Sequence, residues 1–114
     1  MKQKLRIAWA AGFFEGEGCF YLRNYLFRLN KTCRRRIQVS LGQKGKNGLV
    51  LLKNFQSIVG CGHIYLRKKT NMYIWQADKI GDGLRVFNLF KFYLGPRRTQ
   101  KFKSIYEIET KQRF

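Results

Sequence analysis

The sequence predicts an α+β fold in which helices cover one face of an antiparallel sheet. Apolar residues recur with helical spacing in some segments and alternate with polar residues in others. These segments follow one another in the order αββαββα, with one further helix at the end. With 45% apolar and 16% aromatic residues in 114 positions, the chain can build one modest core, so we expect residues 1–114 to form a single domain.

The first predicted elements are a helix and a strand hairpin. Residues 5–17 form an apolar run with a small residue at every fourth position, which is typical of a closely packed helix. Strands are expected at 19–27 and 34–41, joined through a turn at 30–32. Their alternation separates inward from outward side chains. The inward set includes Phe20, Leu22, Ile37, Val39 and Leu41. The outward set comprises Tyr21, Arg23, Tyr25, Arg34, Arg36, Gln38 and Ser40.

The second half of the chain repeats the order of helix and hairpin. Glycines at 45 and 48 are expected to break the chain before a helix at 49–59, which Gly60 ends. A Lys-Lys-Thr-Asn turn at 68–71 should join two further strands. The Gly95-Pro96 pair should separate the last two helices. The remaining elements are expected at 63–67 and 72–77 as strands, and at 84–93 and 97–110 as helices.

The charge of the chain predicts a polyanionic partner. Lys and Arg number 24 and Asp and Glu number 6, which gives a net charge of +18. Such a charge would suit nucleic acid or an anionic membrane surface. The apolar content indicates a packed core and not a solvated basic tail, and no apolar run approaches the length of a membrane span. No secretory signal is visible at the start. We therefore expect nucleic acid, and no membrane, as the partner.

The cysteines and the histidine give no sign of a zinc site or of nucleophilic catalysis. Cys19, Cys33 and Cys61 are an odd number without a CxxC pair, and His63 is the only histidine. The spacing of Cys61 and His63 is not that of zinc ligands. No serine lies in a nucleophile elbow. We interpret the three cysteines as reduced thiols of an intracellular protein.

Two carboxylates near the end of the first helix stand apart from the rest of the sequence. Glu15 and Glu17 are the only acidic residues before Asp78, and twelve Lys and Arg residues lie between Gly18 and Ala77. Carboxylates at a helix C-terminus face the negative end of the helix dipole, and a bound cation would reverse this penalty. The pair therefore suggests a divalent metal held against phosphate. An ordinary amphipathic helix with two solvated carboxylates is the alternative.

Residues Ala10 to Gly18, Ala-Ala-Gly-Phe-Phe-Glu-Gly-Glu-Gly, resemble the LAGLIDADG motif of homing endonucleases. The resemblance implies the αββαββα fold of that family and a helix that runs directly into a strand. It also implies that Glu17 binds the catalytic Mg²⁺, for which glutamate provides the oxygen ligands. Glu15 would instead support the end of the motif helix.

The resemblance implies two further catalytic residues. Gln43 would contact a water near the metal, with a simple turn residue beside Gly42 as the alternative. Arg97 would lie by the scissile phosphate and stabilise negative charge, although it cannot act as a base. A helix start that anchors phosphate through Arg97, Arg98 and Lys101 is an equally good interpretation.

Only one copy of the motif is present. Residues 77–84 contain acids and glycines but lack the apolar run. Family members with one motif work as homodimers, so this chain should pair through the small residues Ala8, Gly12 and Gly16. The polar face of the sheet lacks acidic residues and should lie in the major groove. Its expected DNA contacts are Tyr21, Arg23, Tyr25, Arg34, Arg36, Gln38, Ser40, Tyr65, Arg67 and Lys69.

The favoured hypothesis is a site-specific endonuclease of the intron-homing type. It would bind a long, near-palindromic double-stranded DNA site as a homodimer and hydrolyse phosphodiesters with a divalent metal. A maturase of the same fold, which binds intron RNA and assists splicing without cutting DNA, is the alternative. A basic nucleic-acid-binding module without chemistry is a third hypothesis. We expect the gene to be encoded in a mitochondrion or chloroplast.

Overall fold

The computed structural model describes the backbone of residues 2–27 and 32–111. It also describes the side chains of these residues, except those of residues 24–27 and 32–34. Within this part the chain forms helices and strands in the predicted order. The elements are α1 (Lys2–Glu17), β1 (Gly18–Phe27), β2 (Thr32–Lys44), α2 (Gly45–Val59), β3 (His63–Arg67), β4 (Met72–Ala77), α3 (Asp82–Phe90) and α4 (Pro96–Lys111).

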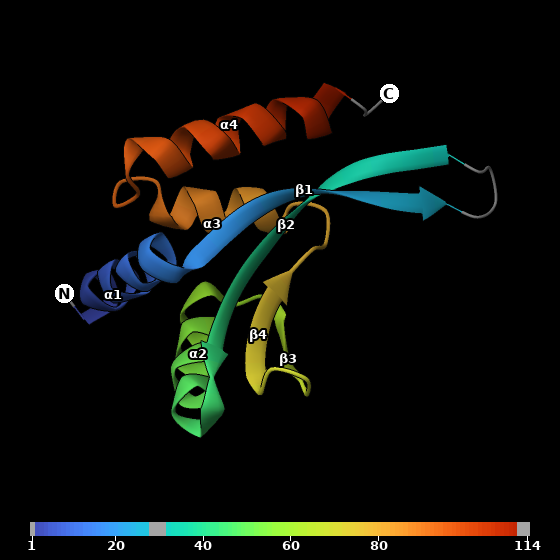
Figure 1. Ribbon diagram of the computed structural model, residues 1–114. Helices are drawn as coiled ribbons and strands as arrows, with labels where there is room; N and C mark the ends of the chain where they lie inside the picture. Colours follow the sequence, from blue (N-terminus) through green and yellow to red (C-terminus); the bar gives the residue numbers. More distant parts are fainter. Residues whose placement is uncertain (1, 28–31, 112–114) are drawn as a thin grey trace.

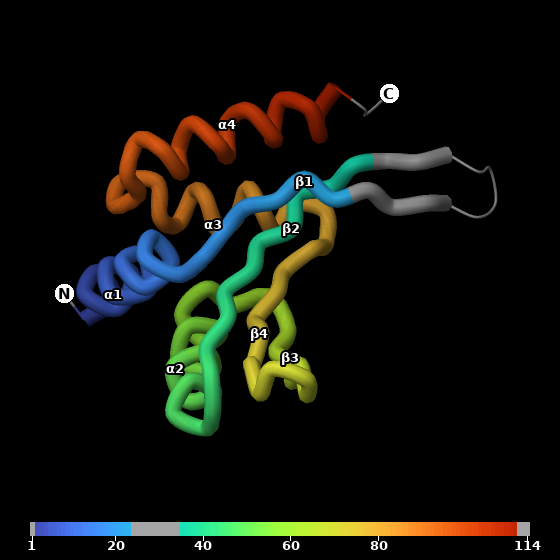
Figure 2. Tube along the Cα trace, in the orientation of Figure 1, coloured from blue at the N-terminus to red at the C-terminus, as the bar shows by residue number. Residues whose placement is uncertain are grey.

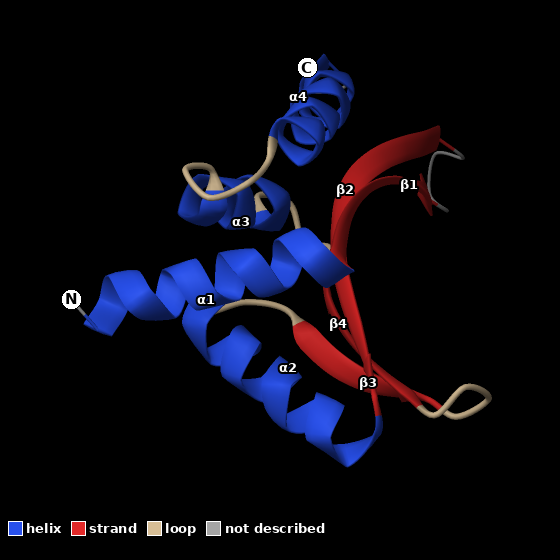
Figure 3. Ribbon diagram, turned by 60° about the vertical axis from the view of Figure 1, so that its left-hand side comes forward, coloured by secondary structure: helices blue, strands red, loops and turns tan. Residues whose placement is uncertain are grey.

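The four strands make one antiparallel sheet in the order β1-β2-β4-β3. Phe20 lies opposite Val39, Leu41 opposite Trp75, and Ile64 also opposite Trp75. The helices lie on one side of this curved sheet and leave its other face open (Figures 1 and 3). The predicted α+β fold with helices on one face is therefore confirmed.

The core lies between the sheet and the helices and is built around aromatic rings. Phe14 of α1 is fully buried, and its ring centroid lies 5.0 Å from that of Phe20, 6.4 Å from that of Phe55 and 5.9 Å from that of Phe90. Phe55 in turn packs edge-on against Trp75 at 4.8 Å. Since aromatic side chains bury more area than any others, this cluster fixes α1 on the sheet and on α2 and α3.

Beyond the end of β4, a buried glutamate of α4 accepts a hydrogen bond from the backbone of β2. The pairing of β2 with β4 begins at Val39, so the backbone N–H of Ile37 has no strand partner on that side. This N–H donates to Oε2 of Glu109, on α4, at 2.7 Å, and Glu109 is only 8% exposed. Buried backbone donors are almost always satisfied, and here α4 provides the acceptor.

Several predicted boundaries are wrong by a few residues. The predicted break at 45–48 is absent, because α2 begins at Gly45, where a φ of +74° turns the chain out of β2. Gly48 is buried inside this helix, where a Cβ would lie 2.6 Å from Cβ of Gln43. α3 ends at Phe90 and not at Tyr93, because the Tyr93 N–H donates to the Phe90 carbonyl in a turn.

The end of the first helix lies close to the start of the last one. The C-terminal end of α1 lies beside the start of α4 (Figure 2), and the N–H of Gly95, directly before α4, donates to Oε1 of Glu15, 80 positions earlier in the sequence. Among the described residues, no helix has the length and apolar character needed to cross a membrane.

Candidate active site and nucleic-acid interface

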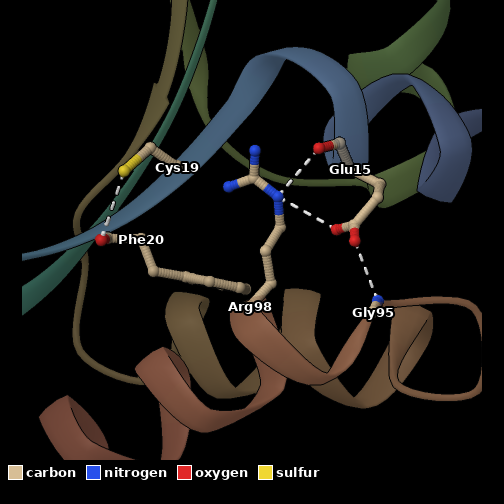
Figure 4. A network of polar contacts seen from close by, with 5 residues as sticks. All are labelled: Glu15, Cys19, Phe20, Gly95 and Arg98. Carbon is tan, nitrogen blue, oxygen red and sulfur yellow. Dashed lines mark hydrogen bonds and ion pairs between the residues drawn. The ribbon is translucent and has the colours of Figure 1, made fainter.

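The two carboxylates of α1 have opposite surroundings. Glu17, the last residue of α1, is exposed, and within the described part of the chain it makes no hydrogen bond or ion pair. Glu15 is partly buried against the start of α4, as Figure 4 shows. Its Oε1 accepts a hydrogen bond from the Gly95 N–H at 2.9 Å, and its Oε2 lies 2.9 Å from Nε of Arg98.

These contacts explain how a carboxylate is stable at the end of α1. Glu15 faces the negative end of the α1 dipole, which is unfavourable on its own. Gly95 immediately precedes α4, so its N–H belongs to the positive end of another helix. The guanidinium of Arg98 adds a full positive charge. Glu15 is thus engaged in holding the helix end, in the supporting position expected for it, and Glu17 is the carboxylate left open to a ligand.

Arg98 links α4 to α1 through one nitrogen. Its Nε–H donates to the backbone carbonyl of Glu15 at 2.9 Å, so Oε2 of the same residue has an ion pair with Nε but no hydrogen bond. The guanidinium carbon lies 5.6 Å above the Phe14 ring, within the range of a cation–π contact. The sequence predicts Arg98 at the helix start but gives no sign of this pairing.

The glycines of the motif serve two different surfaces. A Cβ on Gly18 would overlap with the Phe14 ring, so the last glycine of the motif lets β1 begin close against α1. Gly12 and Gly16 are exposed, and a Cβ on either would meet nothing within 4 Å. Ala8, the third residue of the expected stripe, is half-buried. The stripe is therefore open along Gly12 and Gly16.

A cleft of about 440 Å³ lies where α1, β1 and α4 meet. Arg97 lines it and is exposed. Arg98 and Lys101 line it as well, together with the Glu15 carboxylate, so three cations and one carboxylate face one space beside Gly18. This arrangement suits a phosphate. The Gly95 N–H, however, is already taken by Glu15, so an anion held by the start of α4 would rely on side chains.

Gln43 lies near the end of α1 but on the helix-covered face. It lies in β2 two residues beyond Leu41, which pairs with Gly18. Its Cβ approaches Gly48 of α2, and the side chain is half-buried. Gln43 does not line the cleft with the three cations. The alternative of a turn residue is wrong, since Gln43 lies within β2 and pairs with Tyr73.

A second cleft, of about 450 Å³, lies on the polar face of the sheet. Six of the residues predicted to contact DNA line it together: Tyr21, Arg23, Gln38, Ser40, Tyr65 and Arg67. No acidic residue with a described side chain lines it, so Arg23 and Arg67 give it positive charge. Partial burial, with a smaller effect of Cys19, raises the pKa of the Tyr21 hydroxyl, so this group stays a donor at neutral pH.

Two buried glutamines form the floor of this cleft. Gln38 is only 8% exposed, and its Oε1 accepts from Nη1 of Arg23 at 2.9 Å. Gln76, which was not predicted as a site residue, is 9% exposed and accepts from the Tyr65 hydroxyl at 3.3 Å. Gln76 lies on the same alternating face, and this pattern could have identified it. Gln38 lies on the predicted outward face, where it is buried and hydrogen-bonded to Arg23.

The remaining predicted DNA contacts lie around the cleft or outside the described side chains. Arg36 is half-buried, and its Nη1 donates to the Asp78 carbonyl at 3.4 Å. Lys69 is exposed in the turn between β3 and β4. The backbones of Tyr25 and Arg34 face each other across β1 and β2, but their side chains lie outside the described residues.

No cluster of three or more His, Cys, Asp or Glu side chains that could hold a metal occurs in residues with described side chains. Cys19 and Cys61 are free thiols, and burial raises the pKa of Cys61, whereas the side chain of Cys33 lies outside the described residues. At the end of α1, Glu17 is therefore a single exposed carboxylate on one chain. A divalent ion would need oxygen ligands from a second chain, from water or from a substrate.

The structure resembles solved homing endonucleases at low sequence identity. The homing endonuclease I-CvuI, in complex with its target in the presence of Ca, superposes with a TM-score of 0.76 and 22% identity over 97% of this chain and 72% of that one. I-TnaI, another homing endonuclease, matches with a TM-score of 0.75 and 23% identity over 89% of this chain and 69% of that one.

A group I intron-encoded homing endonuclease, I-CeuI complexed with DNA, gives a TM-score of 0.77 at 15% identity over 90% of this chain and 53% of that one. At these identities the likeness establishes the fold. No curated protein sequence matches the chain. The family model described as LAGLIDADG endonuclease matches residues 10–110, which include the motif at Ala10 to Gly18 and every strand of the sheet. The chain therefore belongs to the LAGLIDADG endonuclease family.

Proposed function

We propose that this chain is a site-specific DNA endonuclease of the homing type that acts as a homodimer and needs a divalent metal. The observation that carries the proposal is the exposed Glu17 carboxylate, whose neighbour in sequence, Gly18, lines the cleft with Arg97, Arg98 and Lys101. The membership of the family and the solved relatives with bound DNA support it.

The carboxylate chemistry fits Mg²⁺ if two chains combine. Mg²⁺ in phosphate-processing enzymes is usually bound by one or two carboxylates together with substrate phosphates and water. One Glu17 from each of two chains would provide two carboxylates. When bound, Mg²⁺ would polarise the phosphate and lower the pKa of a coordinated water. Arg97 and Lys101 would neutralise the charge that develops on the phosphate oxygens.

The open face of α1 supports pairing of two copies of this chain. Leu5 is 69% exposed and Trp9 38% exposed, and both lie on one helical stripe with Gly12 and Gly16. An apolar stripe that ends in two glycines allows two helix backbones to approach closely near Glu17. Burying Leu5 and Trp9 against a second copy would remove apolar surface from water and stabilise the dimer.

The polar face of the sheet is the surface that would contact the DNA. It carries Tyr21, Arg23, Ser40 and Arg67 around a cleft without acidic residues among the described side chains. Such side chains make hydrogen bonds with base edges in the major groove and with phosphates. The net charge of +18 would add a strong, salt-dependent attraction to DNA of any sequence.

A cleavage selection tests the proposal without knowledge of the natural site. The purified protein is incubated with a plasmid library of randomised, near-palindromic sites in Mg²⁺ or in EDTA, and cut ends are sequenced. We expect Mg²⁺-dependent double-strand cuts at a small, related set of sites. Tight DNA binding without cuts would instead favour a binding module. Binding of structured RNA in preference to DNA, again without cuts, would favour a maturase.

A further inference from the structure

We propose that Glu15 and Arg98 form a positioning pair that fixes the Glu17 carboxylate and directs the Arg98 guanidinium into the cation-lined cleft. The proposal deepens the proposed function, since it rests on Glu17 as the metal ligand. Neither Glu15 nor Arg98 is assigned here as a ligand of the metal. Their role is to hold the end of α1 in one orientation.

The pair joins two elements that carry the site. Figure 4 shows Glu15 held from two directions, by Gly95 and by Arg98. Arg98 contacts both the side chain and the backbone carbonyl of Glu15, at 2.9 Å each. A contact with the backbone at the last turn of α1 restrains the helix itself and not only one side chain. Since Arg98 is part of α4, this turn is tied to a second helix.

The Arg98–Glu15 pair is less exposed to solvent than the Lys111–Glu107 pair of α4. The side chains of Arg98 and Glu15 are 25% and 36% exposed. The Lys111–Glu107 pair has the same 2.9 Å distance, but its side chains are 73% and 66% exposed. Exposed pairs contribute little, because water and salt screen them. At the same distance, the Arg98–Glu15 pair should therefore restrain its helices more strongly than the Lys111–Glu107 pair does.

Glu17 depends on this restraint because little else holds it. Only Gly16 separates it from Glu15, and a Cβ on Gly16 would meet nothing within 4 Å. Glu17 itself has no partner among the described residues. On the other side, Gly18 packs on the Phe14 ring. Glu17 thus projects from a short backbone segment that is fixed at Glu15 and at Gly18.

The geometry of Arg98 requires a guanidinium. Its Nε is committed to Glu15, and its carbon lies over Phe14. Figure 4 shows the two terminal nitrogens directed away from the Glu15 carboxylate, and Arg98 lines the cleft with Arg97 and Lys101. Lysine has one nitrogen and no fixed fork, so it could not hold Glu15 and face the cleft at the same time.

The test is a double-mutant cycle with Glu15→Gln and Arg98→Lys. Glutamine keeps an acceptor for the Gly95 N–H but loses the charge, and lysine keeps the charge but loses the fork. We expect each variant to lower kcat by about tenfold to a hundredfold at saturating DNA, because a small misplacement of reacting groups has an effect of that order. KM for DNA should change much less. The double variant should be no worse than either single variant.

A second readout separates positioning from a loss of folding. Binding of Mn²⁺ to the protein–DNA complex is followed by the EPR signal of the free ion, at a temperature where circular dichroism shows each variant folded. We expect weaker Mn²⁺ binding in both single variants. The matched control is Glu107→Gln, which removes the exposed ion pair of the same helix and should leave kcat and Mn²⁺ binding unchanged.

Two results would overturn the positioning pair. One is a kcat that follows only the folded fraction while Mn²⁺ binding stays at the wild-type value. The other is an additive double variant, since independent residues add and coupled ones do not. Glu17→Gln in the same assays distinguishes a failure of the proposed function from a failure of the positioning pair. If Glu17→Gln still cuts, the proposed function fails at its metal site. If it is inactive while Glu15→Gln and Arg98→Lys are unchanged, only the positioning pair fails.

Discussion

The two faces of the sheet carry alternate residues of the same strands, yet different forces hold them. Phe20 and Val39 are buried on the face under the helices, where rings pack about each other. Tyr21 and Gln38, their neighbours in sequence, line the open polar face. On the first face, close packing leaves no room for change. On the second, a few hydrogen bonds between side chains hold the surface. Substitutions should therefore affect stability on one face and DNA preference on the other.

The helix α1 also has one packed face and one open face. A substitution on its open face should have the largest effect on cleavage. Gly12→Leu should yield monomers that no longer cleave DNA, because the leucine would hold two motif helices apart. A Cβ at Gly12 meets nothing within the chain, and leucine favours helix more than glycine does, so the monomer should stay folded. Sedimentation and a cleavage assay measure both effects.

Asn88→Leu is the control for this variant, since it adds the same side chain at an exposed position of α3. It should leave assembly and cleavage unchanged. If the wild-type protein sediments as a monomer both free and on DNA, the proposed homodimer is wrong. Gly12 and Gly16 then do not form an interface between two copies.

The packed face should respond to Phe14→Ala with a loss of about 3–5 kcal/mol in the free energy of unfolding. Phe14 is fully buried and contacts three other rings, so alanine would leave a cavity. Urea denaturation measures the change. Phe92→Ala, at an 85% exposed position, should change the free energy by less than about 0.5 kcal/mol. Equal losses in the two variants would remove the distinction between packed and open surfaces.

The polar face should respond to Arg23→Ala with altered base preference. Removal of a bidentate hydrogen-bonding pair with a base costs about 1–3 kcal/mol at its own position. Gln38→Ala should alter preference at the same positions, because Gln38 is buried and contacts Arg23. A cleavage profile over randomised half-sites measures both variants. Lys53→Ala, on the exposed side of α2, is the control. If Lys53→Ala changes the profile and the other two do not, the DNA lies on the helical side.

The smallest effect on DNA binding is expected from a substitution at the rim of the polar face. Lys69→Ala, in the exposed turn between β3 and β4, should weaken binding to all sequences alike. The slope of log K against log salt should fall in magnitude by about one for each phosphate that the protein no longer neutralises. Filter binding at several salt concentrations gives this slope. A change in base preference without a change in slope would place Lys69 among the residues that contact bases.

The strands and their faces were predictable because alternation is a local property of the sequence. The bounds of β3 and β4 are those predicted, and Ile37, Val39 and Leu41 are buried as expected. The start of α2 was not predictable in the same way. Gly45 adopts a left-handed conformation to begin the helix, whereas from sequence alone a glycine is equally consistent with a break.

The contacts that hold the site depend on residues far apart in the chain. Glu15 meets Arg98 across 83 positions, and Ile37 meets Glu109 across 72. No local pattern marks either pair. The motif predicts Glu17 as a site residue because its spacing is local, but the contact between Arg98 and the end of α1 follows only from how α4 packs on α1. The contact of the buried Gln38 with Arg23 on the neighbouring strand is likewise not marked in the local sequence.

In the proposed enzyme, Glu17 is needed for the metal-dependent cleavage, and the rest of the site binds DNA without it. The most direct measurement compares Glu17→Gln with the wild type for cleavage in Mg²⁺ and for DNA affinity in EDTA, on a site selected by the wild-type protein. We predict no cleavage and an affinity equal to or tighter than that of the wild type, because one negative charge near phosphate is removed. Full cleavage by Glu17→Gln would show that the Glu17 carboxylate is not the metal ligand.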